Sequence, residues 1–140
     1  MTERDHSAEI YKRIFQSLER IIGDLSDIPA CMKLKAPGFM DLHFDRLYPG
    51  EGSITVALSH YYKQNGDMVP DPDMEIRIYP GTKMAEALTY QDGFGYRQVY
   101  PSPGKIDVQA KKDLNAFLNQ WLSNLLAQGH PTTKRECVKP

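Results

Sequence analysis

Asp41, His43 and Asp45 alternate along one short segment, and their side chains are of types that can bind a metal or move a proton. On a β-strand, residues two apart point to the same side, roughly 7 Å from one another. An imidazole between two carboxylates can hold a divalent metal or act as a general base. The alternative is the solvated face of an ordinary strand. No second histidine or cysteine lies nearby, as a zinc site requires, so we predict no metal or cofactor here.

A second group of such side chains lies between His60 and Arg77. The acidic residues lack the spacing and the preceding helix of an EF-hand calcium loop. Pro70 and Pro72 indicate a rigid extended loop over 64–73, and loops on rigid scaffolds often carry binding residues. His60 is in register with core residues, which is also typical of a structural histidine. The predicted ligand-binding or partner-binding residues are His60, Tyr61, Asn65, Asp67, Asp73, Arg77 and Tyr79.

Aromatic residues recur through the same half of the chain, with basic residues among them. Such interleaving can stack the bases of a single-stranded nucleic acid. The alternative is cross-strand aromatic packing, which stabilises a sheet without a ligand. The net charge of −1 favours packing, because nucleic-acid-binding domains are usually clearly basic. The residues concerned are Tyr61, Tyr62, Tyr79, Tyr90, Phe94, Tyr96 and Tyr100, with Lys63, Arg77, Lys83 and Arg97.

No familiar catalytic motif is present in the sequence. The serines lack a GxSxG context, and there is no phosphate loop or dinucleotide-binding fingerprint. Hydrophobic residues make up 41% and charged residues 25%, as in ordinary globular proteins. Cys31 and Cys137 have no ligand spacing and no signal peptide precedes them, so we expect two reduced thiols in the cytoplasm; the alternative is a disulfide between them. No apolar run approaches the roughly 20 residues needed to span a bilayer.

Two amphipathic helices are predicted, one near each end of the chain. Apolar residues recur at helical spacing over 7–24, and Gly23 and Pro29 mark the end of that helix. The second helix follows Asp107, a suitable N-cap residue, and stops at Gly129 and Pro131. Its apolar positions are Leu114, Phe117, Leu118, Trp121, Leu122, Leu125 and Leu126.

Between the helices the hydrophobic period changes to two, which predicts strands at 39–48, 54–62, 74–79, 83–90 and 94–100. Residues 83–90 fit a helix as well by composition, but the turns on either side favour a strand. Residues 26–38 are interpreted as a connector. Connections this short join only antiparallel neighbours, so the strands should form a five-stranded meander in sequence order.

The apolar face of a single sheet must be covered, and the two helices are available to cover it. The predicted fold is therefore a two-layer α+β domain over 1–130 with a disordered tail at 131–140, and Trp121 and Phe117 are its largest core residues. Strands 39–48 and 94–100 would be the free edges, which allows a homodimer. The opposite, polar face should carry Asp41, His43, Asp45, Thr55, Ser59, Tyr61, Glu75, Arg77 and Tyr79.

Three segments, 73–79 (DMEIRIY), 84–87 (MAEA) and 114–122 (LNAFLNQWL) with the following Gly129, resemble a known family. They are similar to an uncharacterised bacterial family, a domain of unknown function typified by the YqiB protein. The resemblance extends over about 10–130 and consists mainly of core patterns. It implies a small, soluble, cytoplasmic bacterial protein and supplies no catalytic residues.

The leading functional hypothesis is a non-enzymatic binding or adaptor module whose polar face, or whose 64–73 loop, receives an unknown protein partner. The alternative is a small-molecule-dependent or metal-dependent enzyme with a site near His60 and the 67–73 loop. A second alternative is single-stranded nucleic-acid binding, which the net charge disfavours. No membrane association is expected.

Overall fold

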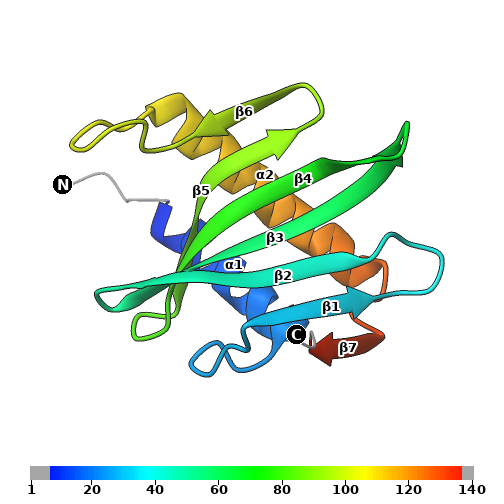
Figure 1. The fold of residues 1–140 in the computed structure, drawn as a ribbon. Helices are drawn as coiled ribbons and strands as arrows, with labels where there is room; N and C mark the ends of the chain where they lie inside the picture. Colours follow the sequence, from blue (N-terminus) through cyan, green and yellow to red (C-terminus); the bar gives the residue numbers. More distant parts are fainter. Residues whose placement is uncertain (1–6, 137–140) are drawn as a thin grey trace.

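The computed structural model describes residues 7–136, without the side chains of residues 7, 62–64, 68 and 70, as two helices on one antiparallel sheet (Figure 1). Helix α1 spans Ser7–Ile22 and helix α2 spans Val108–Ala127, close to their expected bounds. The strands are β1 (Cys31–Lys35), β2 (Leu42–Gly50), β3 (Ser53–Gln64), β4 (Asp67–Tyr79), β5 (Met84–Asp92), β6 (Gly95–Gln98) and β7 (Thr133–Glu136).

The sheet has seven strands in the order β6-β5-β4-β3-β2-β1-β7, so the expectation of five strands was wrong. Strands β1 to β6 do form a meander in sequence order, and residues 84–92 are a strand. The extra strand β1 lies in the supposed connector. Met32 and Leu34 alternate there with exposed or half-buried neighbours, but Pro29 and Pro37 confine the pattern to five residues.

Strand β7 lies in the segment expected to be a disordered tail, and it pairs with β1 through Met32 and Glu136. All four of its residues are exposed and polar, so hydrogen bonding between backbones forms this strand without any apolar burial. The sheet edges are consequently β6 and β7, whereas strand 39–48 was expected at an edge. Cys31 is disulfide-bonded, so the expectation of reduced thiols is wrong for this residue; Cys137 lies outside the described residues.

The expected 64–73 loop is mostly a β-hairpin. Strand β4 begins at Asp67, and Tyr62 pairs with Val69 in the β3–β4 ladder. Asn65 and Gly66 form the turn, with φ angles of 52° and 86°. Both angles are positive, as a tight hairpin turn requires, and asparagine followed by glycine is the residue pair that adopts them most easily. Pro70 and Pro72, which were expected in a loop, lie in strand β4.

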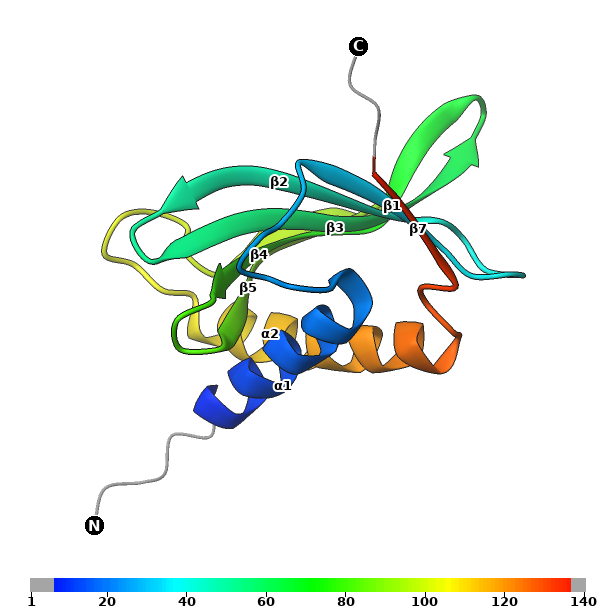
Figure 2. The ribbon, with the colours of Figure 1, turned by 90° about the horizontal axis from the view of Figure 1, so that it is seen from below.

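Both helices lie on the same side of the sheet, and the other side carries no helix in the part of the chain that the structure describes (Figure 2). The buried core between the helices and the sheet includes Ile14 and Leu18 of α1, Phe44 and Ile76 of the sheet, and Trp121 of α2. Phe117 was expected beside Trp121 in the core, but it is exposed and stacks on the edge of the Tyr90 ring.

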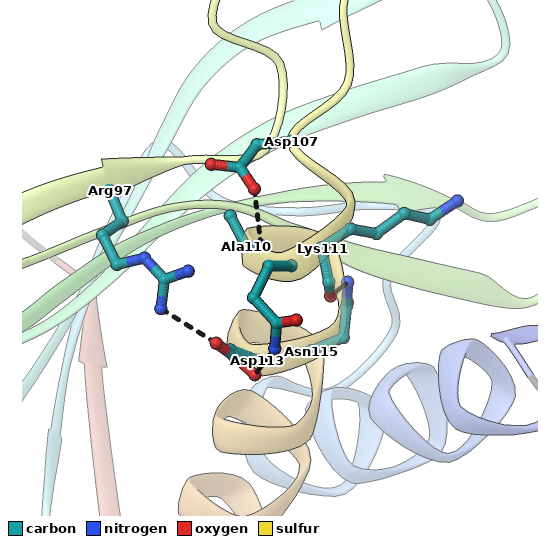
Figure 3. Close-up of polar contacts among 7 residues, drawn as sticks. Arg97, Asp107, Ala110, Lys111, Asp113 and Asn115 are labelled. Carbon is teal, nitrogen blue, oxygen red and sulfur yellow. Dashed lines mark hydrogen bonds and ion pairs between the residues drawn. The ribbon is translucent and has the colours of Figure 1, made fainter.

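Polar contacts attach the start of α2 to the sheet (Figure 3). The Asp107 side chain accepts a hydrogen bond from the Ala110 N–H at 2.9 Å and caps the helix as expected. Arg97 of β6 pairs with Asp113 at 3.2 Å. Asn115 is buried; its Oδ1 accepts a 2.8 Å hydrogen bond from the Ala87 backbone N–H. The β4–β5 ladder shifts register beside Ala87, so this side chain supplies an acceptor where the strand pairing is irregular.

Among the residues that the structure describes, no helix is long and apolar enough to cross a membrane.

Candidate binding site on the polar face

The polar face contains two adjoining open cavities, of about 230 and 310 Å³, and Tyr48 and Arg77 line both of them. We call this pair of cavities the tyrosine cleft. Five neighbouring strands, β2 to β6, supply most of it, and their side chains on this face point away from the helices. Its walls are formed by Tyr48, Pro49, Gly50, Glu51, Ser53, Thr55, Glu75, Arg77, Tyr79, Leu88, Thr89, Tyr96, Gln98 and Tyr100.

A buried carboxylate lies beneath one side of the tyrosine cleft. Glu86 of β5 is only 7% exposed, and its two oxygens accept hydrogen bonds from two tyrosine hydroxyls. Tyr79 donates at 2.8 Å and Tyr100 donates at 2.6 Å. The Arg77 guanidinium lies 5.8 Å from the centre of the Tyr100 ring. Hydrogen bonds compensate the burial of this charge and fix both tyrosine rings, so the cleft wall is preorganised.

Tyr79, Tyr100 and Arg77 stay in their ordinary neutral-pH charge states. Burial, followed by the hydrogen bond to Glu86, raises the pKa of Tyr100. Burial is also the main factor that raises the pKa of Tyr79. The Tyr79 hydroxyl is the largest influence that raises the pKa of Arg77. The tyrosines are therefore hydrogen-bond donors and poor bases at neutral pH, which suits recognition better than proton abstraction.

The central part of the polar face is acidic. Asp73 and Glu75 lie two residues apart on β4, and Asp45 lies on β2 two strands away. Burial raises the pKa of Asp73, and the negative charges of Glu75 and Asp45 raise it further. Tyr61 donates a 3.2 Å hydrogen bond to Asp73 Oδ2. None of these three carboxylates forms an ion pair with a described basic side chain.

The structure divides the predicted site residues into three groups. Tyr61, Asp73, Arg77 and Tyr79 do share the polar face. Asn65 and Asp67 lie at the end of the β3–β4 hairpin, roughly 20 Å along the strand from Asp73.

His60 stands apart as the third group, because its side chain lies on the side of the sheet that the helices cover. The register of β3 and β4 shifts between Ser59 and Tyr61, and the His60 ring packs edge-on against Trp121 with the ring centres 5.6 Å apart. A site that combines His60 with Asp67 and Asp73 is therefore not formed.

His60 instead pairs with a histidine that the sequence analysis did not select. The rings of His60 and His130 are 6.1 Å apart, and the two residues are 7% and 3% exposed. His60 Nε2 and both ring nitrogens of His130 have no hydrogen-bond partner among the described groups. Burial, and then the His130 and His43 charges, lower the pKa of His60 to about 4, although Asp41 opposes this. Burial also lowers the pKa of His130.

The segment from Asp41 to Asp45 is not arranged as a ligand set. Asp41 lies 3.8 Å from Lys33 and 3.9 Å from Lys35, so β1 supplies its counter-charges. His43 packs edge-on against Tyr61, with the ring centres 5.7 Å apart. Among the described residues, no three or more histidine, cysteine or acidic side chains are grouped so that they could hold a metal ion.

Sequence reasoning missed Glu86, His130 and Tyr48 as site residues. Glu86 stands between alanines in a segment that fits helix or strand, so only the pairing of Arg77 with Glu86 across β4 and β5 reveals its role. Tyr48 follows a register shift in β2 that turns it over the cleft. Its hydroxyl donates a 3.3 Å hydrogen bond to Glu75.

A family model for a domain of unknown function, DUF6908, matches residues 9–131. The chain belongs to this family. The match covers all of α1 but its first two residues, helix α2, strands β1 to β6 and the tyrosine cleft of this DUF6908 domain. No curated protein and no solved structure matches the chain.

Proposed function

We propose that this DUF6908 domain is a non-enzymatic binding module, and that its polar face receives a protein partner through a segment rich in lysine or arginine. One observation carries the proposal. Tyr48 and Tyr96 are 52% and 53% exposed over a preorganised cleft that no described element covers. Tyrosine and arginine are enriched in the energetically important parts of protein interfaces, and Arg77 lines the same cavity as these two tyrosines.

The charge of the polar face selects the partner's chemistry. Asp45, Asp73 and Glu75 lack ion pairs with described side chains, and burial and mutual repulsion already raise the pKa of Asp73. A cationic side chain placed among them would relieve that repulsion, and the tyrosine faces would add cation–π attraction. The same charges oppose a nucleic-acid backbone. Arg97, one of the basic residues expected to bind it, is paired with Asp113 of α2.

The proposal also includes the type of protein within the family, its source, its location and the extent of the domain. Resemblance at 73–79 and 114–122 supports kinship with the YqiB type and a bacterial source, and we propose a single domain over most of the chain. The resemblance also implies a cytoplasmic location, but the disulfide at Cys31 favours an oxidising compartment instead, because cytosolic disulfides are rare.

Quantitative recovery of partners from a lysate tests the proposal. The protein is immobilised and compared with the double variant Tyr48→Ala/Tyr96→Ala, whose exposed side chains support little of the core. The matched control is Glu19→Ala/Arg20→Ala on the exposed side of α1, which leaves the net charge unchanged. We expect a specific partner to be lost with the tyrosine variant and retained with the control.

The expected partner also elutes with rising salt, because contacts between exposed charges are screened. Asp73→Asn/Glu75→Gln should weaken its retention in the same way. Recovery that is the same for the tyrosine variant, the charge variant and the unaltered protein would refute a binding role of the polar face.

A further inference from the structure

A second cavity lies on the opposite side of the molecule, between the first turns of the two helices. Its volume is about 500 Å³, within the range of sites for small ligands. It is separate from the tyrosine cleft, which is formed on the other face of the sheet. Its walls include Ile10 and Tyr11 of α1, Ile106 in the preceding loop, and Val108, Lys111 and Lys112 of α2.

The exposed surface of the cavity walls is mostly apolar. Val108 is 74% exposed and Ile106 is 53% exposed. Single exposed apolar residues are ordinary on protein surfaces. Here, however, Val108 and Ile106 line one cavity together with the half-buried Ile10. A ligand with an aliphatic chain would bury these side chains, and the removal of apolar surface from water would stabilise the complex.

Among the described residues, the charged groups that line this cavity are Lys111 and Lys112, and no carboxylate lines it. Two acidic residues close to these lysines along the chain are engaged elsewhere, because Asp107 caps α2 and Asp113 pairs with Arg97 (Figure 3). Glu9, in the first turn of α1, is exposed and does not line the cavity. Figure 3 shows Lys111 extending away from the ion pair of Arg97 and Asp113.

The Lys111 ammonium is also held in place, 5.9 Å from the centre of the Tyr11 ring. Neither lysine forms an ion pair with an acidic side chain in the part of the chain that the structure describes.

We propose that this cavity binds a single-chain amphiphile with a carboxylate head, of the fatty-acid class. The aliphatic chain would lie against Ile10, Ile106 and Val108, and the carboxylate would be bound by Lys111 and Lys112. This inference goes beyond the proposed function, because it concerns other residues on the other side of the sheet.

Calorimetric titration of the purified protein with dodecanoate, below its micelle concentration, tests the proposal. Dodecylamine has the same chain and the opposite charge, and acetate has the head without the chain. We expect saturable binding of dodecanoate at one site and no comparable binding of dodecylamine or acetate. Equal binding of the amine and the carboxylate, or no binding of dodecanoate, would overturn the proposal.

Two variants locate the site. Val108→Asp places a carboxylate on the cavity wall, and Lys111→Glu/Lys112→Glu reverses the charge at the head. Each should weaken dodecanoate binding by about tenfold or more. Lys105→Glu is the control, because it reverses an exposed charge near α2 outside the cavity walls.

Unaltered melting temperatures would show that the variants fold, which the high exposure of Val108 favours. Binding that persists in both variants would overturn the assigned site. A concentration-dependent dimer that Val108→Asp dissociates would instead identify a second copy of the chain as the occupant and overturn the amphiphile proposal. Tyr48→Ala/Tyr96→Ala should bind dodecanoate normally, so failure of either proposal leaves the other testable.

Discussion

Acidification should destabilise the fold through His60, which is buried without a partner for its Nε2 atom. In the folded state burial lowers the pKa of His60 to about 4, from an ordinary value of 6.5. The unfolded chain therefore takes up a proton between pH 6.5 and 4 that the folded protein does not. The stability from the neutral histidine is complete above pH 6.5 and is lost as the pH falls toward 4.

The size of the effect follows from the same values. Each pH unit between the two pKa values is worth about 1.36 kcal/mol, so the fall from 6.5 to about 4 sets an upper limit of about 3 kcal/mol. Access of water to the ring reduces this, and we expect His60 to account for about 2 kcal/mol. That is a substantial share of the 5–15 kcal/mol typical of a small domain. Burial of His130 acts in the same direction.

Urea unfolding at pH 7.5 and at pH 4.5 measures the effect in the unaltered protein and in His60→Leu. The leucine cannot be protonated and fits the apolar contact with Trp121. The free energy of unfolding should fall by about 2 kcal/mol less in His60→Leu than in the unaltered protein over this range.

Gln16→Leu, at an exposed position of α1, is the control and should keep the pH dependence of the unaltered protein. Parallel curves for the unaltered protein and His60→Leu would refute the reasoning. So would a His60 imidazole that titrates near pH 6.5 in the folded protein by NMR.

Three further predictions concern single contacts. Asn115→Leu should lower the free energy of unfolding by about 1–3 kcal/mol in urea melts, because a backbone N–H of β5 loses its buried acceptor; the exposed Asn124→Leu should have little effect, and equal losses would contradict this. Glu86→Gln should destabilise the fold by a similar 1–3 kcal/mol, since one of two tyrosine hydroxyls loses its acceptor; an unchanged melting curve would contradict the network, and Tyr100→Phe should add less to Glu86→Gln than to the unaltered protein. Because Cys31 is disulfide-bonded, alkylation of the unfolded, unreduced protein should leave its mass unchanged by mass spectrometry, and any alkylated Cys31 would contradict the disulfide.

The elements that bury a regular apolar stripe were the ones predictable from sequence. Helix α2 combines such a stripe with an Asp107 cap and a stop at Gly129, and all three features are confirmed. Strand β1 offers only Met32 and Leu34 between two prolines, so its pattern is too short to stand out. Strand β7 buries no side chain, and its position depends on a partner strand about a hundred residues earlier.

The candidate site was predictable only where alternation along one strand determines the face. Arg77 and Tyr79 were correctly assigned to the polar face with Glu75, because β4 alternates regularly there. His60 was placed correctly among the core residues by register, yet its ring contact with His130 joins distant parts of the chain. Glu86 became identifiable only through its cross-strand neighbour, which a single sequence does not specify.

The pairing of β1 with β7 also affects the order in which the chain can fold during synthesis. Met32 and Glu136 are neighbours in the ladder, although 104 residues separate them along the chain. A ribosome would deliver β1 to β6 and both helices before the last strand emerged. Until then the backbone groups of β1 on that side would remain unpaired, and an unpaired strand edge invites association between nascent chains. Pairing with β7 thus covers the strand edge of β1 that stays exposed earlier in synthesis.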